Sequence, residues 1–203
     1  MGYPIIKAAC ITNLTDARYF AAKSVAFLGF NLVEGTEGYL DPMYMKAMRA
    51  WVEGPQIVGE FAHTPVAVVA EAARFFELDA VQLAGLPDTQ DLAVLADWPV
   101  LLQLEWPPIP AALLEICAEK APFVQYFILE ITAAHWPAHA DLLQTLCAKY
   151  PFLLHIHLDT ETVQTIMEQV QPAGLNLQGG EEEQVGIKSF DTLDTIFDLF
   201  EED

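Results

Sequence analysis

Short apolar runs alternate with longer amphipathic segments from one end of the chain to the other. The apolar runs are six to eight residues long, a length typical of β-strands, and lie at 5–10, 26–33, 56–61, 80–85, 100–105, 126–131, 152–157 and 174–179. The segments that follow them have the apolar spacing of helices and begin near Thr15, Asp41, Pro65, Asp88, Pro110, Ala138, Asp159 and Asp191. The pattern therefore predicts eight strand–helix units.

This repetition indicates one particular architecture. Near-continuous apolar strands that alternate with helices are typical of a parallel sheet buried on both faces. Eight such units close into a (β/α)8 TIM barrel, and we expect a single domain over residues 1–203. Because barrel enzymes build their sites at the C-terminal ends of the strands, the residues at these ends are the ones to examine for function.

Charge narrows the choice of partners. The chain has 29 acidic and 9 basic residues, a formal net charge of −20, which would repel nucleic acid and an anionic membrane surface. We therefore expect neither as a partner. No apolar stretch approaches the roughly 18 residues of a membrane-spanning helix, and we expect a cytoplasmic protein. The three cysteines, at positions 10, 117 and 147, lack a paired spacing and predict neither a disulfide framework nor a zinc site.

Three segments carry a resemblance to a known family. "KAACITNLTDARYFAA", "IVGEFAHTPVAVVAEAARFFELDAVQLAG" and "PAGLNLQGGEEEQVGIKSFDTLDTIFDLF" occur in this order along the chain. Together they resemble phosphoribosylanthranilate isomerase, a TIM barrel of tryptophan biosynthesis. The resemblance implies an Amadori rearrangement of a phosphorylated aminosugar without a cofactor. It also implies a cysteine base at the end of the first strand and an aspartate acid near the end of the sixth.

The residues expected for catalysis are displaced or altered in this chain. Aligned on "ITNLTDA", Lys7 matches the family's lysine, Ala9 takes the place of the catalytic cysteine, and Cys10 takes the place of the following glycine. One residue of shift along a strand turns a side chain to the opposite face, so we expect Cys10 to point away from the site unless a bulge intervenes. Glu130 is the nearest match to the acid.

The family's phosphate-binding motifs are also altered. The resemblance implies Gly-Gly after the seventh strand and Ser-Ser-Gly after the eighth, which hold phosphate through backbone N–H groups. This chain has Ile156-His157 at the first position and Gln178-Gly179-Gly180 at the second. The two glycines could form an anion-binding nest or a plain turn.

The expected mouth of the barrel is strongly acidic. The strand ends and the loops after them carry Glu34, Glu37, Glu60, Glu105, Glu130, Asp159, Glu181, Glu182 and Glu183. The family's substrate carries about three negative charges, and each like-charge pair at about 4 Å costs about 4 kcal/mol at an effective dielectric of about 20. This mouth is expected to oppose binding of the phosphosugar.

A second hypothesis for the acidic mouth is a metal site. His155 and His157 lie on one face of the seventh strand, and with Glu130 or Glu105 they could ligate a divalent ion. The alternative is a pair of hydrogen-bonded histidines at the rim, because the sequence specifies no third ligand.

Two functions remain open from the sequence. The first is an isomerase-like barrel with a degenerate active site, which binds another small molecule or a protein through residues such as His157, Gln178, Gly179 and Gly180. The second is an active isomerase with a relocated base, in which Cys10 accepts the proton, Glu130 donates it, and Gly179 and Gly180 hold the phosphate. The sequence favours the first function, without a cofactor. An apolar patch on the helices would favour a homodimer.

Overall fold

The computed structural model describes residues 3–157, 159–179, 182–184, 187–188 and 190–201. Eight parallel strands form a closed barrel in chain order, with each strand paired to the next and β8 paired to β1. The strands are β1 (Ile5–Ala9), β2 (Phe27–Asn31), β3 (Gln56–Ala62), β4 (Ala80–Ala84), β5 (Val100–Leu104), β6 (Tyr126–Ile131), β7 (Phe152–Ile156) and β8 (Gly174–Gln178). The predicted single-domain (β/α)8 TIM barrel is confirmed.

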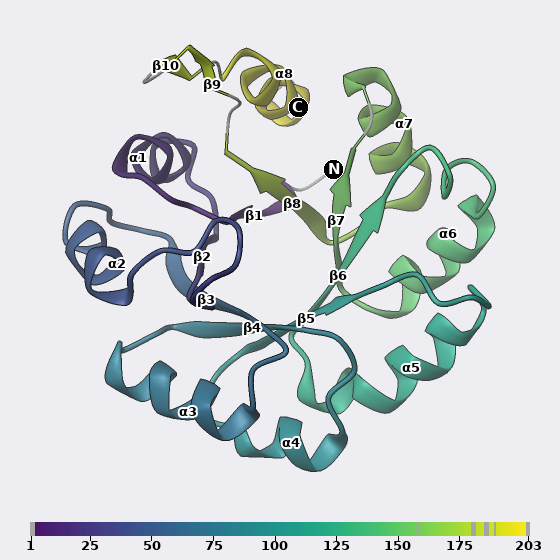
Figure 1. Ribbon diagram of the computed structural model, residues 1–203. Helices are drawn as coiled ribbons and strands as arrows, with labels where there is room; N and C mark the ends of the chain where they lie inside the picture. Colours follow the sequence, from purple (N-terminus) through teal and green to yellow (C-terminus); the bar gives the residue numbers. More distant parts are fainter. Residues whose placement is uncertain (1–2, 158, 180–181, 185–186, 189, 202–203) are drawn as a thin grey trace.

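The helices form the outer ring around these strands (Figure 1). They are α1 (Leu14–Ala22), α2 (Pro42–Arg49), α3 (Val66–Phe75), α4 (Thr89–Val94), α5 (Ala112–Lys120), α6 (Ala140–Lys149), α7 (Thr160–Val170) and α8 (Asp191–Glu201), with a short 3-10 helix η1 (Ala121–Phe123) after α5. None of the helices in the described ranges is both long and apolar enough to span a membrane. An antiparallel hairpin of β9 (Glu182–Gln184) and β10 (Ile187–Lys188), which the apolar pattern did not predict, lies outside the barrel.

Local chemistry explains several of the helix starts. Asp41 accepts hydrogen bonds from the backbone N–H groups of Met43 and Tyr44, and Pro42 occupies the first helical position of α2. Asp159 caps α7 in the same way through the N–H of Thr162. These caps satisfy backbone donors that the helix leaves without partners. They explain why the sequence located these two helices to within a residue.

The inside of the barrel has an apolar floor. Inward-facing side chains, one from each strand from β2 to β7, pack together at the end of the barrel opposite the strand C-termini. They are Phe27, Val58, Ala80, Leu101, Ile128 and Leu153. A larger apolar cluster fills the space between the barrel and its helices. Because side chains alternate between the two faces of a strand, positions two residues further along also point inward. The residue two positions after Val58 is Glu60.

Above this floor the interior is polar and contains an ion pair. Lys7, fully buried on β1, pairs with Glu60 on β3, which is 6% exposed. Lys7 Nζ also donates a hydrogen bond to Asn176 Oδ1 at 3.1 Å, and Asn176 is the register partner of Lys7 on β8. Gly29 leaves room for this pair, because a Cβ at this position would lie 2.7 Å from Lys7 Nζ. The centre of the barrel is therefore closed by two compensating charges.

This pair gives a stability prediction. Lys7→Met removes the ammonium group and leaves the Glu60 carboxylate buried without its cation, which is expected to lower the free energy of unfolding by about 3–5 kcal/mol. The double variant Lys7→Met/Glu60→Leu contains neither charge and is expected to recover most of this loss. Urea denaturation of both variants at neutral pH measures the difference. Equal stability of the single and double variants would contradict the assignment.

Candidate functional site

A cavity of about 410 Å3 lies at the C-terminal ends of the strands. We call it the mouth cavity. It is lined by Ala9, Cys10, Asn31, Thr36, Glu60, Phe61, Ala62, Gln82, Ala84, Gln103, Glu130, His155, His157, Asn176 and Gln178. The barrel thus brings together five of the candidate catalytic, ligand-binding and metal-ligating residues from the sequence, namely Cys10, Glu130, His155, His157 and Gln178, together with Glu60 of the predicted acidic mouth.

The prediction that Cys10 turns away from this site was wrong. β1 ends at Ala9, and Cys10 adopts a left-handed backbone conformation with φ of 50°. The alternation of side chains along a strand no longer applies to a residue in this conformation, so Ala9 and Cys10 both line the mouth cavity. A left-handed residue, and not a bulge, directs the thiol into the site.

The Cys10 thiol faces a carboxylate. Glu60 Oε2 accepts hydrogen bonds from the backbone N–H of Cys10 at 3.1 Å and from Cys10 Sγ at 3.4 Å. Burial of the thiol, followed by the charge of Glu60 and its hydrogen bond, raises the pKa of Cys10 to about 12, and Lys7 and Gln178 only partly oppose this. Cys10 is therefore a protonated hydrogen-bond donor at neutral pH and not a thiolate base.

Glu60 is the site residue that sequence reasoning missed. The sequence placed it among the carboxylates of an acidic mouth, yet it is buried and its charge is compensated by Lys7. A signal was present, because Glu60 stands at an inward-facing position two residues after the apolar Val58, and Lys7 stands two residues after the apolar Ile5 in "IIKAAC". Two opposite charges at inward-facing positions of neighbouring parts of a barrel indicate a buried pair.

Glu130 lies on the wall of the mouth cavity. Its side chain is 52% exposed, and its Oε1 lies 3.5 Å from His157 Nε2. Its backbone oxygen accepts a hydrogen bond from Trp106 Nε1 at 2.6 Å, which ties the end of β6 to the loop after β5. The carboxylate predicted as the proton donor thus does lie in the same cavity as the Cys10 thiol.

His155 lies deeper in the cavity than His157. Burial, together with the nearby His157 and Lys7, lowers the pKa of His155 to about 4, so its imidazole is neutral at physiological pH. The two rings lie 4.2 Å apart between centroids. Within the described part of the chain, no three His, Cys, Asp or Glu side chains cluster closely enough to hold a metal ion. The third ligand that the metal hypothesis required is missing from that part.

The glycines expected to bind phosphate are only partly described. Gly180 lies outside the described residues, and Gly179 is packed against α1, where a Cβ at Gly179 would lie 2.6 Å from Asp16 Oδ2. Gln178 lines the mouth cavity, but Gly179 does not. A carboxylate this close to Gly179 opposes the binding of an anion there.

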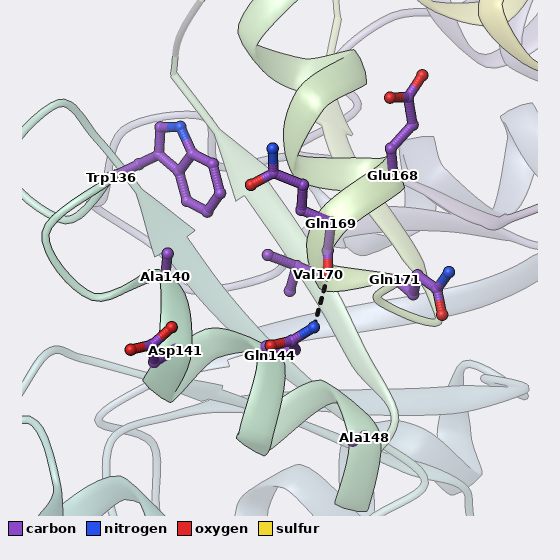
Figure 2. Close-up of a pocket in the computed structure, with 9 residues that line it drawn as sticks. All are labelled: Trp136, Ala140, Asp141, Gln144, Ala148, Glu168, Gln169, Val170 and Gln171. Carbon is purple, nitrogen blue, oxygen red and sulfur yellow. Dashed lines mark hydrogen bonds between the residues drawn. The ribbon is translucent and has the colours of Figure 1, made fainter.

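A second cavity, of about 550 Å3, lies in the helical ring between α6 and α7 (Figure 2). It is lined by Trp136, Ala140, Asp141, Gln144, Ala148, Glu168, Gln169, Val170 and Gln171. Gln144 Nε2 crosses it to the backbone oxygen of Gln169 at 3.3 Å. None of the residues singled out from the sequence lines this cavity, so the mouth cavity is the candidate site.

The state of the thiol can be tested by alkylation. With a pKa of about 12, Cys10 in the native protein is expected to react with iodoacetamide far more slowly than free cysteine at mildly alkaline pH. Glu60→Gln removes the carboxylate charge and should accelerate the reaction of Cys10 about tenfold or more. Mass spectrometry of the Cys10 peptide measures both rates.

The fully buried Cys117 is the control in that experiment, because faster labelling of Cys117 would report general opening of the variant and not a change at Cys10. Native Cys10 that reacts as fast as free cysteine would overturn the assignment.

The low pKa of His155 predicts a pH dependence of stability. In the folded state the pKa of His155 is about 4, below the ordinary value of 6.5. Between pH 4 and 6.5, His155 therefore binds a proton more readily in the unfolded chain than in the folded protein. The corresponding stability is present above about pH 6.5 and is lost as the pH falls toward 4. An NMR titration should show the His155 ring, assigned with His155→Gln, titrating near 4. A titration midpoint near pH 6.5 would refute the lowered pKa of His155.

Comparison with known proteins finds relatives that cover nearly the whole chain. The family model described as N-(5'phosphoribosyl)anthranilate (PRA) isomerase matches residues 6–199. An N-(5'-phosphoribosyl)anthranilate isomerase of Synechococcus sp. (strain JA-2-3B'a(2-13)) is 28% identical over 209 residues, covering 95% of this chain and 88% of that protein.

Two solved structures share the fold. Phosphoribosyl anthranilate isomerase from Thermococcus kodakaraensis superposes with a TM-score of 0.82 at 16% identity, covering 98% of this chain and 100% of that one. The isomerase from Thermus thermophilus has a TM-score of 0.75 at 22% identity, covering 96% and 97% of the two chains. The family model spans nearly the whole barrel, and the chain belongs to the N-(5'-phosphoribosyl)anthranilate isomerase family.

Proposed function

We propose that this member of the isomerase family no longer performs the Amadori rearrangement and binds a different small molecule in its mouth cavity. The observation that carries this proposal is the Cys10 thiol, which donates to the Glu60 carboxylate and has a pKa raised to about 12. A general base must be largely deprotonated near the working pH to accept a proton efficiently. Cys10 does not meet this requirement.

The charge of the cavity supports the same proposal. Of the described residues that line the mouth cavity, two are glutamates and none is lysine or arginine. The buried Lys7 beneath them is paired with Glu60 and held by Asn176, so its charge is already compensated. A ligand that carries phosphate and carboxylate groups would meet Glu130 in this cavity, and the described lining residues include no lysine or arginine to balance it.

One observation favours the alternative function, an active isomerase with a relocated base. Cys10 and Glu130 line the same cavity, as a proton acceptor and a proton donor would have to. In this alternative, the Cys10 thiol would have to lose its proton, through a change at Glu60 or through contact with the substrate.

Turnover of N-(5'-phosphoribosyl)anthranilate by the purified full chain separates the two functions. Loss of general-base catalysis alone is expected to lower kcat/KM at least about 10²-fold relative to the Thermus thermophilus isomerase assayed in parallel. We expect no turnover above the blank and no complementation of a tryptophan auxotroph that lacks this isomerase.

Should turnover appear, Cys10→Ser is the decisive variant. Turnover by itself would overturn the proposal. Loss of this turnover in Cys10→Ser, with activity retained in the matched variant Cys147→Ser on α6, would establish the alternative. One solved isomerase structure holds reduced 1-(o-carboxyphenylamino)-1-deoxyribulose 5-phosphate. Calorimetry with this compound tests binding separately from chemistry, and we expect no binding.

A further inference from the structure

We infer that the mouth cavity binds a small organic ammonium ion, recognised by hydrogen-bond acceptors and negative charge at the strand ends. This inference rests on the proposed function, because it requires that the phosphosugar is not the ligand. The cavity volume of about 410 Å3 falls within the roughly 300–1,000 Å3 of small-molecule sites.

The first argument is an amide oxygen in the cavity wall that has no partner among the described residues. Gln82 on β4 is 6% exposed, and its Nε2 donates to Gln103 Oε1 at 2.9 Å. Its Oε1 has no hydrogen-bond partner among the described residues. Buried polar atoms in native proteins are nearly always paired, because an unpaired one loses its water without compensation. A ligand with an N–H donor would complete the pairing of Gln82.

The second argument is that the donors of two residues in this cavity, Asn31 and Cys10, are already engaged by the protein. Asn31 Nδ2 donates to Thr36 Oγ1 at 2.9 Å and to the backbone oxygen of Glu37 at 2.7 Å. The Cys10 thiol donates to Glu60. These bonds occupy the donors of Asn31 and Cys10, whereas Gln82 Oε1 has no donor among the described residues and can accept from a ligand.

The third argument is charge, which sets the sign of the ligand. Lys7 compensates Glu60, whereas among the described residues the Glu130 carboxylate lies near the imidazole of His157, at 3.5 Å, the outer limit of a hydrogen bond. His155, the other imidazole in the wall, is neutral at physiological pH. The described lining thus has a net negative charge, and a cation would both balance Glu130 and donate to Gln82.

Three linear four-carbon probes with different end groups test the inference. These are 1,4-diaminobutane with two ammonium groups, 1,4-butanediol with two hydroxyls, and succinate with two carboxylates. Binding to the full chain is measured by isothermal titration calorimetry. About 150 mM salt in the buffer suppresses non-specific attraction of the diamine to the acidic surface of the protein. We expect saturable binding of the diamine and none of the diol or succinate.

Variants locate the binding. Glu130→Gln and Gln82→Leu are each expected to weaken diamine binding by about tenfold or more, since each removes an acceptor from the cavity. Glu105→Gln is the matched control, because Glu105 is exposed and does not line the cavity. Glu105→Gln removes one negative charge, as Glu130→Gln does, and should alter the affinity for the diamine by no more than about twofold. Thermal melting of each variant confirms that it is folded.

Several outcomes would overturn the inference. One is the absence of diamine binding up to about 10 mM. Others are binding of the diol as tight as that of the diamine, tighter binding of succinate than of the diamine, or a loss of diamine affinity in Glu105→Gln as large as in Glu130→Gln. The same preparation is assayed for isomerase turnover. Turnover would refute the proposed function, whereas absence of both turnover and diamine binding would refute this inference alone.

Discussion

The ion pair between Lys7 and Glu60 is the constraint around which the interior of this barrel is arranged. Two charges removed from water must compensate one another closely, because an unpaired charge inside a protein is very costly. Gly29 leaves the space for them, and Asn176 holds the lysine from the opposite neighbouring strand. The second oxygen of Glu60 then reaches the end of β1 and holds both the backbone and the thiol of Cys10.

The same pair links the architecture of the barrel to its chemistry. Glu60 neutralises the buried cation beneath the mouth cavity, and its charge raises the pKa of the thiol above it. An anionic substrate would need an uncompensated cation, and a general base would need a deprotonated thiol, and this one carboxylate works against both. The proposed function and the inferred cationic ligand therefore rest on the same electrostatic arrangement.

Cys10 shows how far reasoning from sequence can go at a strand end. The alignment on "ITNLTDA" placed the thiol one residue after the position expected for the base, and alternation along a strand then predicted that it faces away from the site. That rule holds only while the backbone stays extended, and at Cys10 it does not. The side chains of Glu130, His155, His157 and Gln178 followed the rule and line the cavity as their positions predicted, because β6, β7 and β8 stay extended up to these positions or end just before them.

The sequence by itself determined the eight strand–helix units, their boundaries to within a few residues, and the family. These properties depend on local periodicity and on caps such as Asp41 and Asp159, which act over a few residues. Only the tertiary structure decided that Lys7 meets Glu60, 53 residues away, and Asn176, 169 residues away. It also decided that Cys10 turns inward and that Gln82 keeps an unpaired oxygen in the wall. Such contacts depend on barrel closure and register, which bring together strands that lie far apart in the sequence.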